Sequence, residues 1–105
     1  MPRATAWQNK YMPADHHFTI NNGEKWLWRY TTLKGSADGW TEFSKKKVLL
    51  DRRAQHRTRL ELELHEGLHC TLGPTISEEA VTRAANDLAK ILWSLGYRLT
   101  KKDST

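Results

Sequence analysis

The hydrophobic positions in the second half of the chain recur at helical spacing. Leu60, Leu64 and Leu68 follow one another at intervals of four residues, which predicts a helix over about 53–70 with the leucines on its core face. A further helix is predicted over about 77–95, with a buried stripe that consists of Val81, Ala84, Ala85, Leu88, Ile91, Leu92 and Leu95. Because the connection between the two helices is short, we expect them to pack antiparallel.

The first half of the chain has the alternation and composition of strands. Residues 25–33 are rich in aromatic and β-branched side chains and follow the turn signal Asn21-Asn22-Gly23, so they are predicted to form a strand. Its aromatic side chains share one face, which we expect to pack under a helix: Trp26, Trp28 and Tyr30. A second strand, clearest at 47–50, is expected to pair antiparallel with the first.

The rest of the chain divides simply. Residues 1–17 contain Pro2 and Pro13 and lack a sustained period, which predicts an irregular N-terminal arm. Residues 18–99 are expected to form a single α+β domain, and residues 100–105 a basic, polar tail.

Composition limits the classes of protein that fit. The 105 residues, 38% of them hydrophobic, suffice for one modest core. Cys70 is the only cysteine and the first residues lack the apolar core of a signal peptide, so we expect a cytoplasmic protein. The apolar runs are too short to suggest a membrane partner. The net charge of +5 is spread along the chain, which favours a solvated basic surface over a nucleic-acid site.

The chemistry-bearing motif is H-E-x-x-H at residues 65–69, inside the first predicted helix. His65 and His69 lie four residues apart, so their rings stand one above the other on one face and can converge on a cation. Glu66 is turned about 100° from His65 around the helix axis, from where it can reach a water on the metal without being a ligand. This spacing is typical of zinc hydrolases with a single ion.

A third ligand is expected from the second helix, because catalytic zinc sites usually take three protein ligands and leave one position for water. The short connection brings the start of that helix back towards the histidines, where Glu78 and Glu79 stand. Glu78 flanks the predicted buried stripe whereas Glu79 points almost away from it, so we choose Glu78 and keep Glu79 as the alternative. Cys70 and His56 lie on other sides of the helix and are not favoured as ligands.

Three segments of the second half together resemble a known family. They are Leu60-Glu61-Leu62-Glu63-Leu64-His65-Glu66-Gly67-Leu68-His69, Ser77-Glu78-Glu79-Ala80-Val81 and Leu92-Trp93-Ser94-Leu95-Gly96-Tyr97-Arg98. The pattern resembles the small metallopeptidases with H-E-x-x-H that occur in bacteriophage and prophage genomes. More distantly, it is similar to gluzincin-type minimal zincins, in which a Glu on the helix after the motif is the third ligand.

The resemblance implies a zincin-like domain in which a small antiparallel sheet packs on the motif helix and a C-terminal helix. It implies that one Zn²⁺ is held by His65, His69 and either Glu78 or Glu79, and that Glu66 is the general base. The expected function is hydrolysis of a peptide bond in a protein or peptide substrate, by a phage-encoded accessory protein in the host cytoplasm.

Two other functions remain open. One is a non-catalytic phage protein that a metal stabilises and that binds a phage or host protein. The other is a basic nucleic-acid-binding protein that stacks bases on Trp26, Trp28 and Tyr30.

Overall fold

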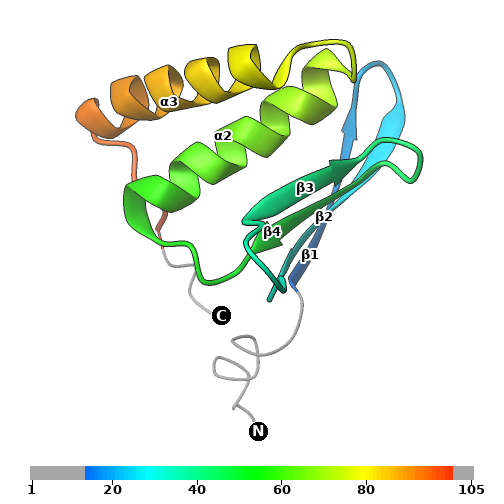
Figure 1. The fold of residues 1–105 in the computed structure, drawn as a ribbon, viewed down its shortest axis with the longest axis horizontal. Coiled ribbons are helices and arrows are strands. Elements are labelled where there is room, and N and C mark those ends of the chain that lie inside the picture. Colours follow the sequence, from blue (N-terminus) through cyan, green and yellow to red (C-terminus); the bar gives the residue numbers. More distant parts are fainter. Residues whose placement is uncertain (1–13, 101–105) are drawn as a thin grey trace, which may run out of the picture.

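A computed structural model describes residues 14–100 as one mixed four-stranded sheet and two helices. The elements are β1 Ala14–Ile20, β2 Glu24–Thr31, β3 Gly39–Glu42, β4 Lys47–Asp51, α2 His56–Leu72 and α3 Glu78–Ser94. Figure 1 shows α2 over one face of the sheet and α3 beside α2. The α+β class expected from the sequence is therefore confirmed. Neither helix within residues 14–100 is long and apolar enough to cross a bilayer.

The chain enters the sheet through a hairpin. Asn21 and Asn22 adopt φ values of 52° and 63°, the left-handed conformation that the tightest hairpin turns require, which confirms the predicted turn. The strand before this turn, β1, was not expected, and the prediction of an irregular arm is wrong for residues 14–17. Phe18 stands opposite Trp26 in the hairpin, so cross-strand pairing orders a segment whose own pattern is weak. Residues 1–13 of the arm and 101–105 of the tail lie outside the described residues.

The sheet is mixed, and the expected antiparallel pairing of the two predicted strands is wrong. β2 and β4 run parallel, with Trp28 opposite Val48. The antiparallel neighbour of β4 is the short strand β3, which precedes β4 in a hairpin and forms one edge of the sheet. The intervening strand reverses the chain once more before β4, which is why β2 and β4 share a direction.

The aromatic face of β2 packs under α2 as predicted. Trp26 is only 4% exposed and belongs to the core with Val48 and Leu50 of β4, while Trp28 and Tyr30 pack against that core. Gly67 of α2 faces this surface, where a Cβ would make ordinary van der Waals contact, 3.9 Å from the ring of Trp28. Trp26 is therefore a core residue, whereas Trp28 and Tyr30 are partly buried beside it.

α2 begins three residues later than predicted, at His56. The Asp51 carboxylate accepts hydrogen bonds from the backbone N–H of Arg53 at 2.9 Å and from the Arg53 guanidinium at 2.6 and 2.9 Å. This local hydrogen bonding makes a turn after β4, in competition with a helical start. Asp51 thus fixes the route of the chain into α2 instead of capping it.

The buried residues of α3 differ from the predicted stripe. Ser77 accepts a hydrogen bond from the backbone N–H of Ala80 at 3.1 Å, as an N-cap does. The buried residues are Val81, Ala85 and Ala89. Three of the residues expected inside, Leu88, Ile91 and Leu95, are 37%, 52% and 69% exposed. The reason is that α3 packs on α2 along its small residues, while its larger apolar side chains lie beyond that contact.

Candidate metal centre

His65, His69 and Glu78 meet between the two helices. The Nε2 atom of His65 lies 2.9 Å from one carboxylate oxygen of Glu78, and the Nε2 atom of His69 lies 2.9 Å from the other. The two imidazoles stand one turn apart on α2, with ring centroids 5.0 Å apart. Their ligand atoms and that of Glu78 all lie within 4.8 Å of one another. Both histidines are half-buried, whereas Glu78 is exposed.

The turn between the helices places Glu78 in this group. Gly73 ends α2 with a φ of 91° and donates its N–H to the carbonyl of His69 at 2.9 Å. Ser77 then caps α3, so Glu78 is the first residue of that helix and faces back towards α2. Glu79 is exposed and does not belong to the group of candidate ligands within residues 14–100. The helical phase that favours Glu78 over Glu79 in the sequence agrees with this placement.

The donor set fits a zinc ion. Two imidazole nitrogens and one carboxylate are the ligands of many catalytic zinc sites, with bonds of about 2.0–2.2 Å. Tetrahedral bonds of that length separate two donors by roughly 3.3 Å. The Nε2 to oxygen distances of 2.9 Å are slightly shorter, so a small outward movement of Glu78 would admit the ion. Because Glu78 is exposed and at a helix end, this movement disturbs no core packing.

Glu66 lies on the sheet side of α2, beside the histidines. It is only 5% exposed, and its Oε1 accepts a hydrogen bond from the Thr41 hydroxyl at 2.6 Å. Burial raises the pKa of the Glu66 carboxyl above its ordinary value, although the hydrogen bond from Thr41 acts in the opposite direction. A proton acceptor with a raised pKa is suited to catalysis near neutral pH.

Strand β3 makes close contact with this carboxylate. A Cβ on Gly39 would lie 2.8 Å from Oε2 of Glu66 and 2.8 Å from a methyl group of Leu62, so only glycine fits there without a shift. Thr41, two residues further, lies on the same side of the strand and supplies the hydrogen bond. The sequence analysis missed both residues, because a contact across 25 positions has no local signal.

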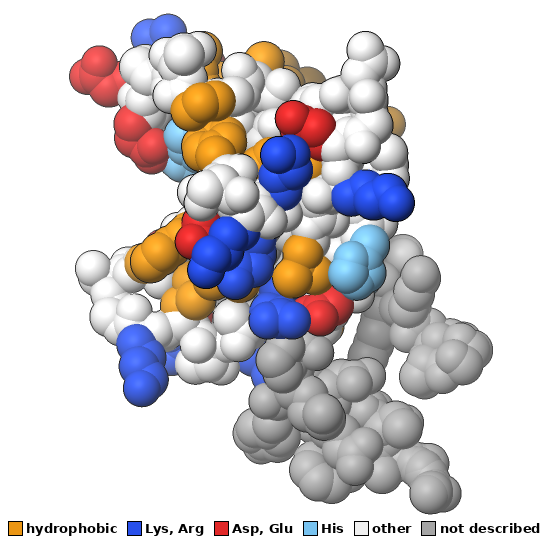
Figure 2. All heavy atoms as spheres, turned by 90° about the vertical axis from the view of Figure 1, so that its right-hand side faces the viewer, with side chains coloured by type: hydrophobic (Ala, Val, Ile, Leu, Met, Phe, Trp, Pro, Cys, Tyr) orange, Lys and Arg blue, Asp and Glu red, His pale blue; other side chains and the backbone are white. Residues whose placement is uncertain are grey.

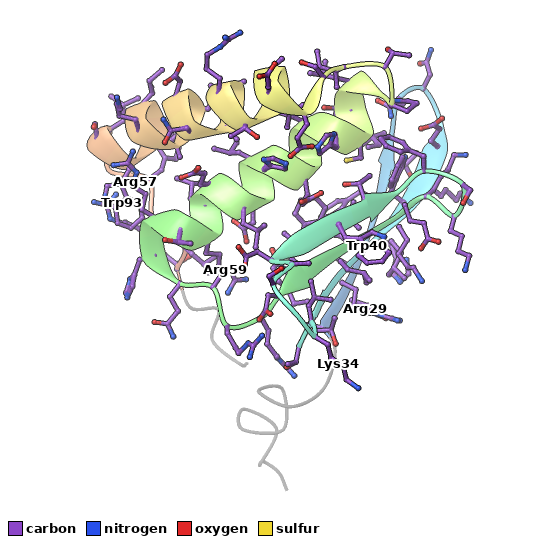
Figure 3. The ribbon with its side chains drawn as sticks, viewed as in Figure 1. Arg29, Lys34, Trp40, Arg57, Arg59 and Trp93 are labelled. Atoms are coloured by element: carbon purple, nitrogen blue, oxygen red, sulfur yellow. The ribbon has the colours of Figure 1, made fainter. Side chains whose placement is uncertain are left out.

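The four predicted site residues line one pocket of about 420 Å³, together with Gly39, Trp40, Thr41 and Phe43. Figure 3 shows Trp40 on β3, and this residue is 53% exposed.

Comparisons with protein-family models, with curated proteins and with solved structures found no match to this chain.

The remaining polar candidates lie elsewhere. Cys70 is buried and its Sγ is 3.4 Å from the carbonyl of Gly67, outside the group of metal-ligand candidates. His56 lines a separate hollow of about 450 Å³ between the start of α2 and the end of α3. Arg59 and Trp93, labelled in Figure 3, line the same hollow.

The basic residues do not gather into one patch on the face drawn in Figure 2, where Lys and Arg side chains stand among acidic, apolar and uncharged groups. Several form ion pairs, as Arg29 does with Asp15 at 2.7 Å and Arg59 with Glu63 at 2.9 Å. This distribution agrees with a solvated basic surface.

Proposed function

We propose that this protein is a zinc-dependent hydrolase of zincin type that cleaves a peptide bond. The observation that carries the proposal is the convergence of His65, His69 and Glu78 from two helices, with the buried carboxylate of Glu66 lining the same pocket. Structural clusters of three donors are common, but here the spacing of the motif and a buried neighbouring acid accompany the cluster.

The residues have separate roles in the proposed reaction. A zinc ion bound here would supply a water of lowered pKa and polarise the substrate carbonyl. His65, His69 and Glu78 would hold that ion. Glu66 takes the proton of the attacking water on its carboxylate and then passes it to the nitrogen of the departing amine. Thr41 and Gly39 keep that carboxylate in place.

The substrate proposed is an extended peptide. β3 is an edge strand, so one side of its backbone has no partner within the described sheet. Its residues Gly39, Trp40 and Thr41 also line the pocket beside the candidate ligands. A peptide that adds to this edge as a further strand would run past the proposed zinc ion, and its backbone hydrogen bonds would fix the position of the scissile bond.

The test is Glu66→Gln in the full chain, assayed with a library of extended peptides and by elemental analysis. We expect the variant to keep its zinc and to lose hydrolysis by at least about 100-fold, the usual contribution of a general base. Glu61→Gln is the matched control, because Glu61 is an acid of the same helix and is not among the candidate ligands within residues 14–100. Undiminished hydrolysis in the Glu66 variant would remove Glu66 from its role.

A second function is favoured by one observation, the way in which α3 is attached. Its buried side chains are one valine and two alanines, and its packing is mainly against α2 rather than the sheet. An ion shared by His65, His69 and Glu78 would hold the two helices together even if nothing were hydrolysed. In that case the wild-type protein binds zinc and melts at a higher temperature with it, but cuts no peptide in the library.

A further inference from the structure

An apolar groove lies on the opposite side of α2 from the candidate metal centre. It has a volume of about 360 Å³ and is lined by Phe18, Ile20, Trp26, Trp28, Tyr30, Glu63, Gly67, Cys70 and Thr71. Its floor is the aromatic face of β1 and β2, and one wall is α2. Within residues 14–100, α2 makes its main sheet contacts with β3 and β4, so β1 is left at the side without a helix over it. Phe18 is 47% exposed there.

We propose that the N-terminal segment of this same chain, residues 1–13, lies in this groove with Trp7 as its anchor. The segment joins β1 directly at Ala14, which pairs with Tyr30, a residue of the groove. It therefore starts at one end of the groove and has only to turn back along β1.

The length of the segment suits this path. Trp7 precedes Ala14 by seven residues, which span up to about 23 Å when extended. β1 also has seven residues, so its length is similar. A reversal of the chain uses two or three of these residues, and the rest still reach about as far along β1 as Phe18, which follows Ala14 by four residues.

The composition of the segment also matches the groove. It contains four large apolar side chains, Met1, Trp7, Tyr11 and Met12. The groove is lined mainly by aromatic and aliphatic side chains, and its one charged residue in the described chain, Glu63, is already paired with Arg59 at 2.9 Å. The match therefore rests on apolar contact, and an aromatic anchor in an apolar groove is a favourable arrangement.

Photo-crosslinking tests the proposal in the full-length protein. With p-benzoylphenylalanine at position 7, illumination should join this residue to the groove, at residues 18–30 or 67–71, in a product of monomer mass. Crosslinks confined to other regions would overturn the proposal. A product of dimer mass would also overturn it, because a second copy would then fill the groove.

Thermal melting supplies a second readout. Trp7→Ala should lower the melting temperature by about 5 °C or more, because a buried indole returns to water. Gln8→Ala is the matched control and should leave the melting temperature unchanged within about 1–2 °C, as an exposed substitution does. Equal melting temperatures of the two variants would contradict an anchoring role for Trp7.

Discussion

The two helices differ in which kinds of side chain they bury. α2 lies between the sheet and α3, and its buried residues are Glu66 and Cys70, one of them a carboxyl. α3 has the stronger apolar pattern, yet it packs mainly on α2 and leaves Leu88, Ile91 and Leu95 exposed. The position of a helix between layers, more than its own pattern, decides what becomes buried. The polar residues of α2 are enclosed because it has neighbours on both sides, and that enclosure gives them their proposed chemistry.

Of the substitutions considered, one at Glu78, which would join α3 to α2 through the proposed zinc ion, should have the largest effect. We expect Glu78→Gln to weaken zinc binding by at least about 100-fold, since even loss of an outer-shell partner of a zinc ligand weakens binding 10–100-fold. The measurement is calorimetric titration with zinc. Glu79→Gln, the neighbouring exposed acid, should bind zinc as the wild type does. Equal losses in both variants would mean that general charge, not coordination, holds the ion.

The contact of α2 with the sheet depends on Thr41. Thr41→Val keeps the shape of the side chain but removes the hydrogen bond to the buried Glu66, at a cost of about 2–3 kcal/mol in the free energy of unfolding. Denaturant unfolding at neutral pH measures this. Thr41→Ser retains the hydroxyl and should recover most of the loss. If serine and valine destabilise equally, the hydrogen bond is not the source of the effect.

The two sides of α3 can be compared directly. Val81 is 1% exposed and faces α2, so Val81→Ala should lower the free energy of unfolding by about 2 kcal/mol through lost burial and a cavity. Ile91→Ala on the exposed side should change it by no more than about 0.5 kcal/mol. Thermal or urea unfolding distinguishes them. A larger effect at Ile91 than at Val81 would show that the outer side is covered in solution.

The turn that leads into α2 should make the free energy of unfolding depend on pH. Hydrogen bonds from Arg53 hold the pKa of Asp51 at about 2, below its ordinary 3.8. A lowered pKa stabilises the fold above pH 3.8, and this contribution disappears as pH falls towards 2. We expect the lowered pKa of Asp51 to contribute on the order of 1–2 kcal/mol to the free energy of unfolding, because exposure of Arg53 to solvent weakens the ion pair. Asp51→Asn should flatten unfolding curves measured between these pH values, and an unchanged dependence would assign it to other groups.

Local signals predicted the elements that local chemistry determines. The Asn21-Asn22-Gly23 turn and the aromatic strand after it have short-range causes, and both were predicted from the sequence. Helical phase favours Glu78 over Glu79 as the third ligand, and Glu78 lies close to His65 and His69 in the structure, but its role as a ligand stays a prediction.

The features that were missed depend on distant partners. β1 is ordered by its pairing with β2, and β3 has only four residues, Gly39–Glu42, too few to show a period. The parallel pairing of β2 and β4 depends on that short strand. The close approach of Gly39 to Glu66 and the hydrogen bond from Thr41 likewise follow from the packing of β3 against α2. No spacing in the sequence reveals this packing.

The central claim is that two imidazoles of α2 and the first carboxylate of α3 bind one divalent ion. The most direct measurement is the zinc content of the full-length protein, purified without added metal and then titrated with zinc, beside His65→Ala and His69→Ala. The claim predicts one tightly bound zinc per wild-type chain and loss of that binding in both variants. A wild-type protein that stays far below stoichiometric zinc after titration, or variants that bind as well as the wild type, would contradict it.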